Sequence, residues 1–262
     1  MSEPSLDAVL FERVNDHVAL VTINRPEARN AVNGDVAEAL ERIVRDVEAD
    51  ENIWVVVLTG AGGKVFSAGA DLKEVAAGNI ARLVRPKSGF AGFVHHERSK
   101  PWIAAVEGLA LAGGCELALT CDMIVASEDG AFGLPEVMRG LIAAAGGLYR
   151  LPRALPPNIA IELILTADRL PARRAAELGM VNHLAPAGET VATALALAEK
   201  IAGNAPLAVF ESLKIAKLSQ EREESELQRM SDEGQARIMK TEDFQEGPRA
   251  FIEKRPPVWK GR

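Results

Sequence analysis

The chain has 262 residues, of which 48% are hydrophobic and 26% charged, a balance typical of an ordinary soluble globular protein. Its net charge of −7 argues against a general nucleic-acid or membrane-surface binder, since such proteins usually carry basic patches. Its two cysteines have no partner cysteines or histidines at metal-ligand spacing, which argues against a disulfide scaffold or a zinc site and suits a reducing compartment. We therefore expect no metal, no nucleic-acid partner and no membrane contact.

The N-terminal stretch 1–14 is acidic and lacks both an apolar signal segment and an Arg-rich pattern. We therefore expect no targeting segment and a cytoplasmic location. No run of about 18 apolar residues is free of charges, which argues against a membrane-spanning helix.

The first half of the chain alternates predicted strands and helices. Apolar, β-branched runs predict strands at 17–24, 53–59, 102–106 and 123–127. Apolar residues at helical spacing predict a surface helix over 36–47, and a second helix begins at Gly113 and runs to Thr120. The segment 75–100, rich in glycine and proline, is expected to be a mobile helix-loop region.

Helical patterns dominate from Pro156 onward. They predict helices at 156–167, 171–179, 189–202, 206–218, 221–240 and 243–254, with a short strand at 180–184. This order favours a layered α/β core followed by a C-terminal helical segment. We divide the chain into a core at 1–195, which carries the site, and a helical region at 196–262.

The stretch from Ile103 to Glu136 carries the chemistry. An apolar run leads into a small-residue turn at 109–114, Glu116 follows within an apolar segment, and Glu136 comes directly after Pro135. Two carboxylates in apolar surroundings near a glycine-rich turn suggest acid–base chemistry with an anion-stabilising backbone site. Partial burial would raise a carboxyl pKa and help it exchange protons near neutral pH.

Each of these features also has a purely structural interpretation. Glu116 alone could be an acid at the start of a helix, favoured by the helix dipole, and Glu136 alone a surface turn residue. Gly113 and Gly114 could serve close packing between a helix and a strand. The pair His95 and His96 could supply a base or a ligand, but we favour a solvated loop pair. Cys115 is interpreted as a small buried apolar residue.

Four motifs resemble the crotonase superfamily, the enoyl-CoA hydratase/isomerase family. They are RPEARNA at 25–31, FSAGADL at 66–72, the long stretch 103–127, and FGLPE at 132–136. The ending at 246–262 looks like the bacterial carnitinyl-CoA dehydratase branch. The resemblance covers nearly the whole chain. It implies a spiral of ββα turns with a C-terminal helical region that assembles trimers, often paired into hexamers.

The resemblance also implies an acyl-CoA thioester substrate, with no metal or redox cofactor. Glu116 and Glu136 match the two hydratase carboxylates, Glu116 chiefly activating the water and Glu136 supplying the C2 proton. The backbone N–H groups of Ala68 and Gly113 would form the oxyanion hole. The CoA path would be lined by Ala28 and Arg29, by Ala68, Gly69, Ala70, Asp71 and Leu72 near the thioester, and by Phe251 and Lys254 of a neighbouring subunit at the nucleotide end.

The leading hypothesis is reversible hydration of the C2=C3 double bond of 2-enoyl-CoA to 3-hydroxyacyl-CoA. A carnitinyl-CoA dehydratase would run the same chemistry on a charged substrate, meeting its trimethylammonium with an acid or an aromatic face such as Phe90 or Phe93. An enoyl-CoA isomerase would need only one carboxylate, and a non-catalytic RNA- or protein-binding relative is disfavoured by the acidic balance. Ala143-Ala144-Ala145 stand where the family commonly has a proline and a glycine or aspartate. That departure changes the turn beside the pocket, so the acyl specificity is open.

Overall fold

The computed structural model describes residues 8–262. The first seven residues, on which half of the targeting-segment prediction rests, lie outside the described residues. Among the helices of the described part, none is long and apolar enough to cross a membrane.

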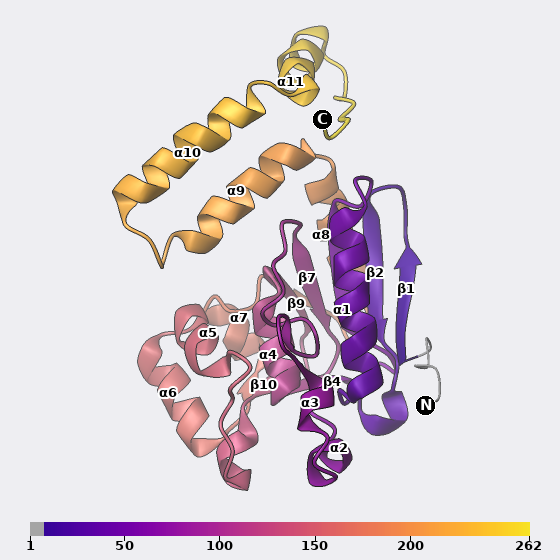
Figure 1. Ribbon diagram of the computed structural model, residues 1–262, viewed down its shortest axis with the longest axis vertical. Coiled ribbons are helices and arrows are strands. Elements are labelled where there is room, and N and C mark those ends of the chain that lie inside the picture. The colour runs from indigo at the N-terminus through magenta and orange to yellow at the C-terminus, as the bar shows by residue number, and fades with distance from the viewer. Residues whose placement is uncertain (1–7) are drawn as a thin grey trace.

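A six-stranded sheet forms the centre of the molecule (Figure 1). Its order is β1 (Val9–Arg13), β2 (Val18–Ile23), β3 (Val55–Gly60), β7 (Trp102–Val106), β9 (Met123–Ser127) and β12 (His183–Ala185). All neighbours are parallel except the antiparallel pair β1 and β2. The four strands predicted in the first half are confirmed, and the strand predicted at 180–184 begins later, at His183. The sequence analysis missed β1, because only its first residue is buried and the alternation is therefore weak.

A second sheet of four short strands builds the spiral. Its order is β11 (Leu170–Pro171), β10 (Ala131–Gly133), β8 (Leu109–Leu111) and β4 (Val65–Ser67). Three successive turns each place one strand in the large sheet, one in the small sheet and then a helix: β3, β4 and α2 (Leu72–Ala76); β7, β8 and α4 (Gly113–Thr120); β9, β10 and the 3₁₀ helix η3 (Pro135–Arg139). The predicted spiral of ββα turns is confirmed.

The predicted turn at 109–114 is wrong in its first half. Residues 109–111 form β8, which pairs with β4 and β10, and Gly113 and Gly114 are the first residues of α4. Three residues are too few for a strand to show alternation in sequence, so only its pairing reveals it.

Helices cover both faces of the large sheet. On one face lies α1 (Gly34–Ala49), which begins after Asn33, whose side chain accepts the Val36 N–H. The opposite face is covered by α8 (Thr190–Ala202). In β3, Val56 and Leu58 pack in the core on the α1 side, while Val55 and Val57 pack in the core beneath α8. Burial on both faces explains why β3 reads as an unbroken apolar run.

The segment 75–100 holds a hairpin that was not predicted. After α3 (Ile80–Leu83), β5 (Val84–Arg85) pairs with β6 (Gly89–Phe90). We call residues 84–98 the flap. The Arg85 Nε donates to Glu41 of α1 at 2.8 Å, and the Ser88 hydroxyl donates to the same carboxylate. The flap is thus bound to α1 at its base.

The remaining helices follow the predicted pattern, with α5 (Gly147–Ala154) added before α6 (Pro157–Thr166) and α7 (Ala172–Glu177). We call residues 206–262 the arm: α9 (Pro206–Leu218), α10 (Glu224–Ile238), α11 (Glu242–Glu253) and the tail. In Figure 1, α10 extends away from the sheets. Phe210 of α9 and Trp259 of the tail pack against the core beneath α8. Because α8 runs unbroken across residue 195, the division of the chain at that residue stays a prediction.

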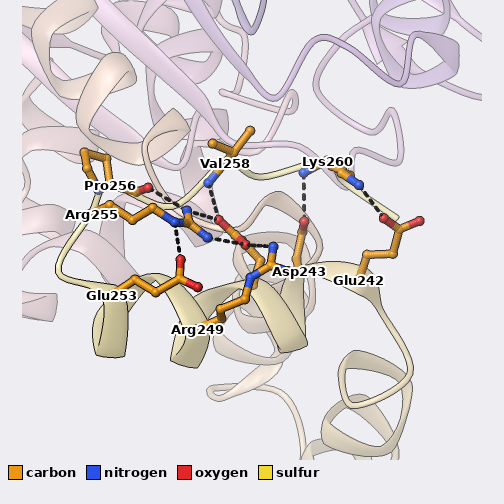
Figure 2. A network of polar contacts seen from close by, with 9 residues as sticks. Glu242, Asp243, Arg249, Glu253, Arg255, Pro256, Val258 and Lys260 are labelled. Carbon is orange, nitrogen blue, oxygen red and sulfur yellow. Dashed lines mark hydrogen bonds and ion pairs between the residues drawn. The ribbon is translucent and has the colours of Figure 1, made fainter.

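The tail folds back along α11 through polar contacts (Figure 2). The Val258 N–H donates to Glu246 at 2.9 Å, and the Lys260 N–H donates to Asp243 at 2.7 Å. The Arg255 guanidinium also binds Glu246. These contacts hold the last residues of the chain against one helix.

Candidate active site

Glu116 lies on α4 and is nearly excluded from solvent, with 3% of its surface exposed. One of its carboxylate oxygens accepts the Gly147 N–H at 2.9 Å, from the start of α5. The start of α4 packs directly against the end of β4, since a Cβ on Gly114 would lie 2.1 Å from the Ser67 carbonyl oxygen. The glycine is required by this close approach and not by a positive φ.

Burial raises the pKa of Glu116 to about 7. The N–H groups of Gly147 and Ala145 and the Arg150 guanidinium oppose this effect, while the negative charge of Glu136 adds to it. A carboxyl group with this pKa can both take up and release a proton near neutral pH.

Glu136 lies in the first turn of η3 and is half-buried. Burial raises its pKa as well. Its Oε2 atom is buried and finds no hydrogen-bond partner among residues 8–262. Since buried polar atoms in native proteins nearly always have a partner, this oxygen marks a position where a polar group of a ligand or a water fits.

The two loops predicted to form the oxyanion hole are in contact, because a Cβ on Gly69 would lie 2.6 Å from the Gly113 nitrogen. The predicted donor Ala68, however, already donates its N–H to the Arg29 carbonyl at 3.0 Å. In the described chain, no acceptor is found for the N–H groups of Ala70 and Gly113. The pair of free donors is therefore Ala70 with Gly113, which corrects the prediction for Ala68. A small-residue motif does not show which of its amides is already paired.

The residues predicted along the CoA path fall into two groups. The turn that holds Ala28 and Arg29 contacts the loop 68–72 through the Ala68 N–H, and Arg25 bridges the two with an ion pair to Asp71 at 3.0 Å. Asp71 also caps α2 by accepting the Lys73 N–H, so its carboxylate is engaged in holding the loop. Leu72 begins α2 and is exposed.

Phe251 and Lys254 are not brought to this site within one chain. Both lie at the end of α11, in the arm and apart from α4 in Figure 1. Phe251 is 85% exposed, so its ring is available to another molecule.

Of the aromatic and histidine candidates, only Phe90 is found beside Gly113. A Cβ on Gly113 would be 2.5 Å from its ring. Phe93 is fully buried against Trp102, with the Arg98 guanidinium 4.1 Å from the ring centroid. His95 Nε2 lies 3.2 Å from the Tyr149 hydroxyl, and His96 Nδ1 lies 3.0 Å from the Glu97 carbonyl.

The sequence analysis did not identify Gly147 and Arg150 as part of the site. The Gly146-Gly147 pair was the only local signal, and it showed a turn without showing what the turn binds. Within residues 8–262, no three His, Cys, Asp or Glu side chains gather as metal ligands would.

The arrangement is one for acid–base chemistry on a substrate that develops negative charge. Two desolvated carboxyl groups interact with each other, and Glu116 lies one helical turn after Gly113, whose N–H has no acceptor among residues 8–262. The model of the family described as enoyl-CoA hydratase/isomerase matches residues 13–262. The chain belongs to this family and is a hydro-lyase enzyme of the crotonase superfamily.

Relatives of known name agree with this membership. A carnitinyl-CoA dehydratase of Salmonella heidelberg is 38% identical over 253 residues, covering 95% of this chain and 97% of the relative. The crystal structure of an enoyl-CoA hydratase from Mycobacterium tuberculosis is 46% identical with a TM-score of 0.94, covering 98% of this chain and 100% of that one. A carnitinyl-CoA hydratase from Mycobacterium avium is 48% identical with a TM-score of 0.78, covering 98% and 99%.

Proposed function

We propose that the protein reversibly hydrates the C2=C3 double bond of 2-enoyl-CoA thioesters to give 3-hydroxyacyl-CoA. The observation that carries this proposal is the desolvated, interacting pair Glu116 and Glu136, together with the Ala70 and Gly113 N–H groups, which have no acceptor within residues 8–262. The names of the relatives, which include enoyl-CoA hydratases and a carnitinyl-CoA dehydratase, support the same chemistry.

In this mechanism the Ala70 and Gly113 N–H groups bind the thioester oxygen. Attack of water at C3 moves the double-bond electrons toward that oxygen, where negative charge develops. One such preorganised donor typically contributes about 3–4 kcal/mol to lowering the barrier. A Cβ on Gly69 would lie 2.6 Å from the Gly113 nitrogen, so glycine at this position keeps a side chain away from that donor.

Glu116 takes a proton from the attacking water as its oxygen bonds to C3, and Glu136 gives a proton to C2. The water is thereby added across the double bond, and the two carboxyl groups exchange roles as donor and acceptor. Proton exchange with solvent or a shared water restores them. Only water and protons move, so this scheme needs no metal and no redox cofactor.

We also propose that the CoA moiety runs along Ala28, Arg29 and the loop 68–72, and that Phe251 and Lys254 meet its nucleotide end from a neighbouring subunit. Exposed apolar side chains on the arm support a homotrimer or a dimer of trimers, because large apolar groups on a surface commonly mark an interface. Light scattering during size-exclusion chromatography measures this assembly directly.

A carnitinyl-CoA dehydratase is the second candidate, because the Salmonella heidelberg relative and the Mycobacterium avium structure described above carry carnitinyl-CoA names. Phe90 is the aromatic ring at the site that could meet a trimethylammonium group. The reaction chemistry would be the same, and only the acyl group would differ.

The experiment is a panel of 2-enoyl-CoA thioesters from crotonyl to long-chain, together with crotonobetainyl-CoA. Loss of the enoyl-thioester absorbance, with product mass increased by one water, shows hydration. A shifted double bond without added mass shows an isomerase, and turnover of crotonobetainyl-CoA alone identifies the second candidate. If folded protein reacts with none of the thioesters in the panel, both proposals are contradicted.

Glu116→Gln and Glu136→Gln are each expected to lower hydration about 10²–10⁴-fold, the usual contribution of a general acid or base. Glu107→Gln is the matched control. Glu107 is also buried, but it accepts the Thr190 hydroxyl at 2.8 Å, and the amide oxygen of glutamine can still do so. Near-normal hydration by both site variants would contradict the proposed roles.

A further inference from the structure

The Arg150 side chain lies between the flap and residues 145–147, the loop whose Gly147 N–H binds Glu116. One guanidinium nitrogen donates to the Ala145 carbonyl at 3.0 Å, and another donates to the Val94 carbonyl at 2.7 Å. Ala145 lies two residues before Gly147, whose N–H binds Glu116. A single guanidinium therefore joins the flap to the loop that orients a candidate catalytic carboxylate.

The backbone of residues 145–147 is shaped around the Arg150 side chain. A Cβ on Gly146 would lie 1.9 Å from the guanidinium, and Gly146 has a φ of 118°, which favours glycine. The Arg150 backbone N–H donates to the Gly146 carbonyl at 2.8 Å. The backbone conformation that points the Gly147 N–H at Glu116 is thus the one that makes room for Arg150.

Two charged side chains near Glu116, Glu136 and Arg150, shift its pKa in opposite directions. Glu136 raises its pKa and the Arg150 guanidinium lowers it, in addition to the larger effect of burial. Cys115 stays neutral, because burial raises the pKa of its thiol. Arg150 itself lies near Tyr149, Arg153 and Cys121 as well as Glu116.

We infer that Arg150 is a positioning residue for the hydration reaction. It ties residues 145–147 to the flap so that the Gly147 N–H stays on Glu116, and it places a positive charge near that carboxylate. Its loss would remove both the restraint and the charge. This inference rests on the proposed function, in which Glu116 accepts the proton of the attacking water.

The test compares Arg150→Gln, Arg150→Lys and Arg153→Gln in the full-length protein with crotonyl-CoA or the best substrate of the panel. Arg153 is the matched control. It lies three residues further along α5, is 46% exposed, and binds Glu221 at 2.8 Å on the surface. Its replacement removes the same charge from the same helix without touching residues 145–147.

For Arg150→Gln we expect kcat to fall about tenfold from misplacement of Glu116, with KM changed little. The acid limb of the pH–rate profile should move to higher pH by roughly half to one unit, because Glu116 loses a nearby cation and part of its hydrogen bonding. Arg150→Lys keeps the charge, so it should restore the position of the acid limb better than kcat. Arg153→Gln should change neither.

A second measurement needs no substrate. The difference in melting temperature between proteins with Glu116 and with Glu116→Gln follows the ionisation of Glu116 as pH is varied. In the Arg150→Gln background this difference should begin at the same pH, keep growing to higher pH and level off at a larger value than in the wild type, because only its upper end follows the folded pKa. In the Arg153→Gln background it should not change.

An unshifted acid limb and an unshifted stability difference in folded Arg150→Gln protein would overturn the inference. Equal shifts in Arg150→Gln and Arg153→Gln would also overturn it, because they would show a long-range charge effect only. If the wild type hydrates no substrate of the panel, the proposed function fails, and the stability measurement still decides the role of Arg150.

Discussion

Glu116 in the spiral core and Glu246 in the arm are both shielded from solvent, yet their pKa values move in opposite directions. Glu116 has one backbone N–H within 3 Å and a second carboxylate nearby, so burial dominates and raises its pKa to about 7. The Arg255 guanidinium, the Val258 N–H and Arg249 surround Glu246 and hold its pKa well below the ordinary range.

The contrast extends to the regions around these residues. In the core, loops of small residues leave backbone donors unpaired and leave a Glu136 oxygen without a partner in the described part of the chain. In the arm, the polar groups of α11 and the tail are paired with one another, and apolar side chains such as Phe251 and Ile252 are exposed. Unsatisfied groups in the core suit a site that binds a ligand, whereas a satisfied polar network suits a structural element.

The largest effect is expected from adding a methyl group at the core loops. In Gly113→Ala the new Cβ would lie 2.5 Å from the Phe90 ring, so the ring or the loop must move. We expect kcat/KM to fall at least about 100-fold, comparable to losing one oxyanion donor, while the melting temperature changes modestly. Steady-state kinetics and thermal unfolding measure the two effects.

Gly203→Ala is the control for this change. Gly203 ends α8 with a φ of −69°, and a Cβ there would make only ordinary contacts at 3.5 Å. Near-wild-type kinetics for Gly113→Ala would show that the approach of the two loops does not matter for the reaction.

A smaller effect concerns stability and its dependence on pH. The folded pKa of Glu116, about 7, lies above its ordinary value of 4.5. The contribution of the Glu116 carboxyl to the free energy of unfolding is therefore complete below pH 4.5 and is lost as the pH rises through 7. Glu116→Gln should therefore be more stable than the wild type at pH 8, by up to about 3 kcal/mol, and not at pH 4.5. Denaturant unfolding at the two pH values checks this, and equal differences at both would contradict it.

Glu246→Gln should behave in the opposite way and with the smallest effect. The pKa of Glu246 is lowered in the folded protein, so its stabilising contribution is present above the ordinary pKa and is lost as the pH falls. We expect a lower melting temperature at pH 7, a smaller difference under acidic conditions, and weakening of the effect by salt. Thermal scans measure the melting temperature, and activity assays should show unchanged hydration per folded subunit. A Glu246→Gln protein that is more stable than the wild type at pH 7 would contradict the comparison.

The order of the long strands and helices was determined by the sequence alone, because long apolar runs and helical spacing are local signals. The strands β3, β7 and β9 and the helices α1, α4 and α6 follow from them. The motifs at 25–31, 66–72, 103–127 and 132–136 pointed to the spiral and to Glu116 and Glu136. The short strands β4, β8 and β10 escaped detection, since a segment of three residues has no periodicity and is defined by its partners.

Tertiary structure alone decided which groups are available for chemistry. The motif FSAGADL contains several amides, and only the fold shows that the Ala68 N–H is paired with Arg29 while the Ala70 N–H has no acceptor within residues 8–262. The pKa of Glu116 likewise depends on burial by segments distant in sequence and on the position of Arg150. Hydrogen bonding and desolvation arise between segments that meet only in the folded chain, so the availability of a donor or a proton is a property of the fold.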